Sequence, residues 1–284
     1  GAELAALTNE AAILAAMRLH TWVTQSDLEE ARDKVRFGRQ KKSHVMEEDD
    51  KQITAYHEAG HAVVNAYMEH TDPVHKITII PRGMALGATM FLPEKDRMHW
   101  SRNRLLDEIC CLYGGRIAEE LFCEDITTGA SSDIERASSL ARQMITHWGM
   151  SKKLGAINFG ERRGNDFLGN EYGMGKNHSA ATAQIIDEEV AALLDEQYQR
   201  AHRTLEEHRD LMERVTDALM RYENVSKFEF EMLVAGASVD EMHAASPPSG
   251  DEERKEPPPM PAAEVPQVAL PLESVEGKES QPEE

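Results

Sequence analysis

The chain has 284 residues, of which 40% are hydrophobic, and a formal net charge of −20 at pH 7. This length and apolar content predict one globular core with appendages, and the acidic charge argues against a nucleic-acid-binding protein. The chain has three cysteines, without C-x-x-C pairs, and no run of 18 apolar residues, which excludes a disulfide framework, a cysteine zinc site and a membrane-spanning segment.

The first 36 residues predict two helices. Apolar side chains recur at helical spacing in the first, at Leu4, Leu7, Ala11 and Leu14. Ser26 and Glu29 have the spacing of a capping box that would open the second helix. Residues 36–50 then contain a basic run followed by an acidic one, which we interpret as a solvated connector rather than a binding patch.

The next segment contains a complete H-E-x-x-H motif, His57-Glu58-Ala59-Gly60-His61. Helical spacing of the flanking apolar residues places it on a helix: Ile53, Tyr56, Gly60, Val63, Val64 and Tyr67. Residues four apart share one face, so His57 and His61 can bind one ion at about 2.0–2.1 Å. Zinc lowers the pKa of water to about 7, and Glu58 is placed to take the proton as general base. The motif therefore predicts a zinc hydrolase, the alternative being a chance pattern on an amphipathic helix.

Two short strands are predicted after this helix, over residues 74–80 and 87–92, because prolines bound both. The remaining periodic segments predict helices over residues 101–121, 133–148, 181–207, 209–222 and 227–234, the last opened by a capping box of Ser226 and Glu229. The predicted fold is mainly α, an α+β class with a small β element.

Two segments lack such periodicity. Residues 155–175 contain six glycines and predict a mobile loop, either a plain connector or a flap or subunit contact near the site. Residues 244–284 contribute −7 to the charge and hold nine of the twelve prolines, so we expect this tail to be disordered.

The residues alone do not identify the third metal ligand. Catalytic zinc takes three protein ligands and leaves one position for water. Glu119 and Glu120 on a following helix are candidates, and Asp133 is another. A carboxylate at Asp133 is also favoured by the dipole at the start of its helix, with or without a metal.

Five blocks of residues, in order, resemble the peptidase domain of the FtsH family of membrane-anchored AAA+ zinc proteases, from residue 51 to about 236. They are residues 53–64 (ITAYHEAGHAVV), 76–83 (KITIIPRG) with 86–94 (LGATMFLPE), 114–120 (GGRIAEE), 127–134 (TTGASSDI) and 186–190 (IDEEV). Residues 1–12 are similar to the end of the helical lid of an AAA+ ATPase. No G-x-x-x-x-G-K-[ST] loop occurs, so we expect no ATPase activity from this chain.

The resemblance implies a division of the chain. Residues 1–38 would be the C-terminal part of the AAA+ lid, 39–51 a linker, 52–242 the zinc metallopeptidase domain and 243–284 a disordered acidic tail rich in proline. The family pattern implies Asp133 as the third ligand, which leaves Glu119 or Glu120 to orient an imidazole.

The resemblance also implies the setting. It implies one Zn²⁺ per chain, with ATP and Mg²⁺ only in an ATPase core missing from this chain. It further implies a homo-hexamer that degrades unfolded or membrane proteins, and a transmembrane anchor upstream. The location would be the bacterial inner membrane with the peptidase on the cytoplasmic side, and the fragment itself would be soluble.

The second predicted strand is a candidate substrate site, because an extended peptide can pair with an exposed strand edge. Its residues are Gly87, Ala88, Thr89, Met90, Phe91 and Leu92. The predicted function is a zinc-dependent endopeptidase of an ATP-dependent protease. The alternatives are a proteolytically inactive ring scaffold or client-binding module, which the intact motif disfavours, and a stand-alone metallopeptidase, which the lid-like helices disfavour.

Overall fold

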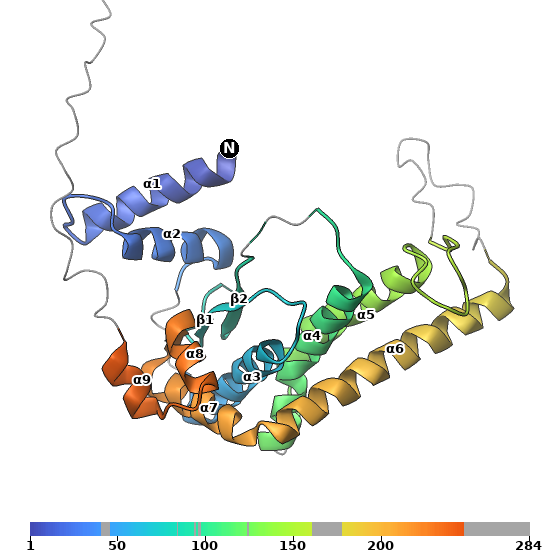
Figure 1. Ribbon diagram of the computed structural model, residues 1–284. Helices are drawn as coiled ribbons and strands as arrows, with labels where there is room; N and C mark the ends of the chain where they lie inside the picture. Colours follow the sequence, from blue (N-terminus) through green and yellow to red (C-terminus); the bar gives the residue numbers. More distant parts are fainter. Residues whose placement is uncertain are drawn as a thin grey trace, which may run out of the picture.

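A computed structural model describes residues 1–40, 46–83, 85–93, 95, 98–123, 125–160 and 178–246. In this part, long helices surround a small three-stranded sheet, which confirms the predicted α+β class (Figure 1). The helices are α1 (Ala2–Met17), α2 (Gln25–Phe37), α3 (Glu48–Ala66), α4 (Arg102–Phe122), α5 (Ser131–Thr146), α6 (Ala180–Glu207), α7 (Arg209–Tyr222), α8 (Lys227–Val234) and α9 (Val239–Ala245). The strands are β1 (Val74–Thr78), β2 (Ala88–Phe91) and β3 (Asn224–Ser226).

The two N-terminal helices form as predicted, but α2 begins with a different cap. The Thr24 side chain accepts a hydrogen bond from Asp27 N at 3.2 Å, and the Asp27 carboxylate accepts one from Thr24 N at 3.0 Å. The prediction of Ser26 and Glu29 as the capping box was therefore wrong. Two capping-box patterns overlap in this sequence, Thr24 with Asp27 and Ser26 with Glu29. The helix uses the first, in which Asp27 is buried and also contacts His20 at 2.9 Å.

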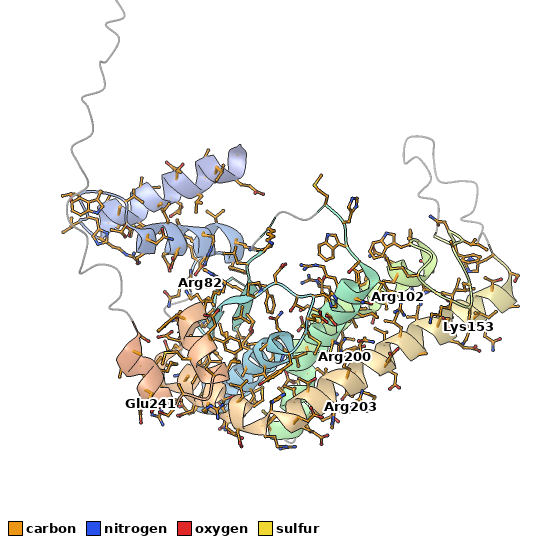
Figure 2. All side chains as sticks on the ribbon, viewed as in Figure 1. Arg82, Arg102, Lys153, Arg200, Arg203 and Glu241 are labelled. Carbon is orange, nitrogen blue, oxygen red and sulfur yellow. The ribbon has the colours of Figure 1, made fainter. Side chains whose placement is uncertain are left out.

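Charged side chains join α1 and α2 to the rest of the molecule. Arg82, in the loop after β1, donates to both carboxylate oxygens of Glu30 at 3.1 and 2.8 Å, and it reaches toward α2 in Figure 2. Lys76 of β1 donates to Asp33 at 3.1 Å. Each of these two pairs joins one buried side chain, Arg82 or Asp33, to a partner whose side chain is 27% exposed.

The sheet has the order β2-β1-β3 with both pairs antiparallel. Ile77 at the centre of β1 faces Thr89 on one side and Val225 on the other. Within the described part of the chain, β2 is thus an edge strand. The strand β3 was not predicted, since three residues are too few to show an alternating pattern.

Helix α3 lies in the middle of the core, packed against α4, α7 and the sheet. Its residues from Thr54 to Asn65 are all buried except His57, so the single apolar stripe predicted for this helix was too narrow. The closest approach to α4 occurs where two glycines meet. A Cβ atom on Gly60 would lie 2.3 Å from the Gly114 carbonyl oxygen, so only glycine fits this crossing.

The C-terminal helices end the described part of the chain. The capping box of Ser226 and Glu229 is present at α8, as predicted. Helix α9 was missed although Ser238 and Glu241 form a further box, and the predicted domain end at residue 242 falls inside it. Most of the predicted tail (residues 247–284) and of the glycine-rich loop (residues 161–177) lies outside the described residues.

Among the described helices, none combines the length and the apolar character that crossing a membrane requires.

Candidate metal centre

Three side chains from two helices converge at one point. His57 and His61 lie one turn apart on α3, and their Nε2 atoms are 3.1 Å from each other. Asp133, in the first turn of α5, places Oδ2 at 3.4 Å from His57 Nε2 and 3.5 Å from His61 Nε2. These are the only three residues among those described that form a possible metal-ligand cluster.

The spacing of these atoms fits a tetrahedral ion. Zinc bonds of about 2.0–2.1 Å at tetrahedral angles place neighbouring ligand atoms about 3.3 Å apart. The three observed separations lie within 0.2 Å of this value. Two imidazoles and one carboxylate also form a donor set that zinc accepts, with room for a fourth ligand.

The other ring nitrogens explain why both Nε2 atoms are free to bind a cation. His57 Nδ1 donates to Glu119 Oε1 and His61 Nδ1 donates to the carbonyl oxygen of Cys111, both at 2.8 Å. With the ring protons on Nδ1, each Nε2 carries a lone pair. Two lone pairs 3.1 Å apart repel each other unless a cation lies between them.

The site is also electrostatically suited to a cation. Without a metal, burial lowers the pKa of His57, but hydrogen bonds to the Asp133 and Glu119 carboxylates overcome this and raise it to about 10, so a proton holds the place at Nε2 that a cation would take. Burial raises the pKa of Asp133, but hydrogen bonds to His57 and His61 hold it well below its usual range. Both shifts show that the carboxylates stabilise positive charge at this point.

Of the two neighbouring glutamates, only Glu119 reaches an imidazole. Its carboxylate is buried, with 1% of the residue exposed, and it also accepts a hydrogen bond from Thr127 N at 2.8 Å. It therefore links His57 to the segment that leads into α5. Glu120 is exposed, and its carboxylate accepts a hydrogen bond from Tyr198 instead. It therefore does not orient an imidazole, the role for which it was a candidate.

Glycine at position 115 leaves room for the His57 ring, a role that was not predicted from the sequence. A Cβ atom on Gly115 would lie 2.5–2.7 Å from three atoms of the His57 ring. Glycine costs about 1 kcal/mol relative to alanine inside a helix. The pair Gly114 and Gly115 inside α4 was therefore the available signal that backbone and side chains approach closely here.

The predicted general base lies between α3 and the edge strand. Only 7% of Glu58 is exposed, and Thr89 Oγ1 of β2 donates to Glu58 Oε2 at 2.7 Å. A Cβ atom on Gly87 would lie 2.8 Å from Glu58 Cγ. The predicted substrate residues thus form β2 with one flanking residue on each side, Gly87 and Leu92, and this strand contacts the base directly.

Comparison with known proteins agrees with this arrangement. The model of peptidase family M41 matches residues 44–233. The chain is 48% identical to ATP-dependent zinc metalloprotease FtsH 2 of Methylacidiphilum infernorum, over 82% of this chain and 36% of the relative. It is 46% identical to FtsH 1 of Thermoanaerobacter sp. and 47% identical to FtsH of Photobacterium profundum, over 84% of this chain and 39% and 34% of those relatives. The chain thus spans little more than a third of the length of these proteins.

Proposed function

The chain belongs to peptidase family M41, and on that premise we propose that it is the zinc-dependent endopeptidase part of an ATP-dependent protease. One observation carries the proposal. The Nε2 atoms of His57 and His61 and the Oδ2 atom of Asp133 lie at the mutual distances of tetrahedral zinc ligands, and the residue beside His57 is a glutamate.

We assign the roles as follows. His57, His61 and Asp133 hold the ion, with His57 oriented by Glu119 and His61 by the carbonyl of Cys111. Zinc in such a site acts as a Lewis acid toward a carbonyl and lowers the pKa of water. Glu58 accepts the proton of the attacking water and passes it to the leaving amine, which completes hydrolysis of the peptide bond.

An extended substrate would pair with the edge of β2. This support is geometric, because β2 borders only β1 among the described strands and its Thr89 contacts the proposed base. Backbone pairing tolerates many side chains, which suits a protease of broad specificity. A substrate-bound structure without backbone pairing to residues 87–92 would reject this part of the proposal.

The names of the relatives describe ATP-dependent zinc metalloproteases, and the rest of the setting is proposed from the resemblance to the FtsH family. We propose that residues 1–38, which include α1 and α2, are the C-terminal part of an AAA+ lid, and that the whole protein forms a hexamer anchored in a bacterial inner membrane. The peptidase would face the cytoplasm and degrade unfolded or membrane proteins threaded to it by the ATPase.

Casein digestion and metal content together test the proposal. We expect Glu58→Gln to retain zinc and to lose at least about 100-fold in digestion rate, because general-base catalysis contributes roughly 10²–10⁴-fold. His61→Ala and Asp133→Ala should lose the zinc itself. Digestion that survives Glu58→Gln, or zinc that remains in Asp133→Ala, would contradict the assignment. A wild-type chain that binds casein and zinc without cleaving would favour the scaffold alternative.

A further inference from the structure

We propose that Thr89 is a positioning residue that fixes the carboxylate of Glu58 through its side chain, so that the proposed substrate strand also holds the base. This inference rests on the proposed function and deepens it. It assigns to the strand a second task, which is distinct from backbone pairing with a peptide.

The hydrogen-bond geometry carries the first step. Thr89 Oγ1 lies 2.7 Å from Glu58 Oε2 and 3.0 Å from the Glu58 backbone oxygen. A hydroxyl has a single proton, so it donates to one of these oxygens at a time. The shorter contact is with the carboxylate, and hydrogen bonds to a charged acceptor are about twice as strong as neutral ones.

Gly87 restrains the same carboxylate from its other side. Two residues before Thr89, a Cβ atom on Gly87 would lie 2.9 Å from Glu58 Oε1 and 2.9 Å from a methyl carbon of Thr54. The Glu58 side chain therefore fills the space in front of this glycine. With Oε2 hydrogen-bonded to Thr89 and Oε1 against Gly87, residues 87–89 set the direction of both oxygens.

Helix α3 alone does not provide this restraint. A glutamate side chain has several rotatable torsions, and among the described residues it is Thr89 that donates a hydrogen bond to this carboxylate. A general base must lie within about 2.6–3.2 Å of the proton that it takes. Because β2 is also the strand whose edge is proposed to bind the peptide, the same strand would hold both the base and the substrate. Loss of the hydroxyl should therefore slow turnover without weakening substrate binding.

Three variants test the inference. Thr89→Val removes the hydroxyl with little change in shape, and Thr89→Ser retains it. Thr78→Val is the matched control, because Thr78 is a buried threonine of the same sheet whose hydroxyl donates to the Glu223 backbone oxygen, next to β3, rather than to Glu58.

We expect Thr89→Val to lower kcat for a quenched fluorescent peptide roughly 10- to 100-fold, since misplacement by about 1 Å can cost 10²-fold. KM and zinc content should stay within about twofold. Thr89→Ser should recover most of the rate, and Thr78→Val should match the wild-type kcat. In a crystal structure of Thr89→Val with zinc, the Glu58 carboxylate should have left its wild-type position.

The results separate this inference from the function on which it rests. Equal kcat in wild type and Thr89→Val overturns the positioning role and leaves the peptidase proposal standing. The positioning role is equally overturned if Thr89→Ser is as slow as Thr89→Val, or if only KM changes. If the wild-type chain shows no zinc-dependent cleavage, the proposed function fails. The crystal structure then decides the inference alone, and an unmoved Glu58 carboxylate overturns it.

Discussion

Adding one methyl group at position 115 should weaken zinc binding while leaving the metal-free fold largely intact. In Gly115→Ala the new Cβ would lie 2.5 Å from Cε1, 2.6 Å from Nε2 and 2.7 Å from Nδ1 of His57. Ordinary contacts between such atoms are about 3.5–4.0 Å. The atoms in the way belong to a side chain, so we expect the imidazole to move by about 1 Å rather than the helices.

Such a shift exceeds what the metal tolerates, because zinc–ligand distances vary by only about 0.2 Å. Disturbing a group that orients a ligand typically costs about 10- to 100-fold in affinity, which equals about 1.4–2.7 kcal/mol. In the absence of zinc, the alanine gains about 1 kcal/mol in helix propensity and loses about 1–3 kcal/mol to overpacking. Because the His57 side chain can move aside, the overpacking cost should lie near the lower end of this range, so the two contributions nearly cancel and the metal-free stability should change little.

The neighbouring glycine provides the control. In Gly114→Ala the Cβ would lie 2.6 Å from the carbonyl oxygen and 2.8 Å from the carbonyl carbon of Gly60, which are backbone atoms of α3. The two helices must then separate because backbone cannot move aside locally, so the overpacking cost should reach about 3 kcal/mol or more and leave a net loss of about 2 kcal/mol after the gain of about 1 kcal/mol in helix propensity. The same chemical change at adjacent positions should therefore affect affinity in one case and stability in the other.

Competition with a chromophoric chelator gives the zinc affinity, and urea denaturation in EDTA gives the metal-free stability. Zinc binding by Gly115→Ala as tight as that of the wild-type chain would refute the expected displacement of the imidazole. A loss of metal-free stability in Gly115→Ala as large as that in Gly114→Ala would refute it as well, because the helices would then have moved instead.

Two further predictions concern buried carboxylates. Glu119→Gln should weaken zinc binding about 10- to 100-fold, because it removes the charge that orients His57, whereas Glu120→Gln should not; equal affinities by chelator competition would contradict this. Burial raises the pKa of Asp27, but hydrogen bonds from its neighbours lower it well below its usual range. The ionised carboxylate therefore stabilises the fold fully above the unfolded pKa of about 3.9, and this stabilisation is lost progressively as the pH falls below that value. Asp27→Asn should accordingly be less stable than wild type at pH 7 in urea denaturation with EDTA. The difference should shrink as the pH falls below about 4, and a difference that stays constant to pH 3 would refute the assignment.

Local signals in the sequence predicted much of the fold. The bounds of α7 and α8 match the predicted segments 209–222 and 227–234, because periodicity within the helix indicates α7 and a capping box begins α8. The spacing of His57, Glu58 and His61 is equally local, since one helical turn brings the two imidazoles together.

Contacts between distant segments could not be predicted in this way. The hydrogen bond of His57 with Glu119 joins residues 62 apart, and that of Thr89 with Glu58 joins residues 31 apart. No periodicity within one element distinguishes Glu119 from Glu120, whose side chains turn to different neighbours once α4 packs against α3 and α6. The third ligand was open for the same reason, and only a resemblance across whole blocks favoured Asp133.

The crossing of α3 and α4 at Gly60 and Gly114 bears on how the proposed metal would bind. Two backbones in direct contact leave no intervening layer of side chains that could rearrange, so the crossing fixes how α3, with its two imidazoles, lies against α4, which holds both Nδ1 atoms through Glu119 and Cys111. A zinc finger, by contrast, spends much of its binding free energy on folding. The proposed cation would bind to helices that already lie in place, so little of its binding free energy would be spent on folding.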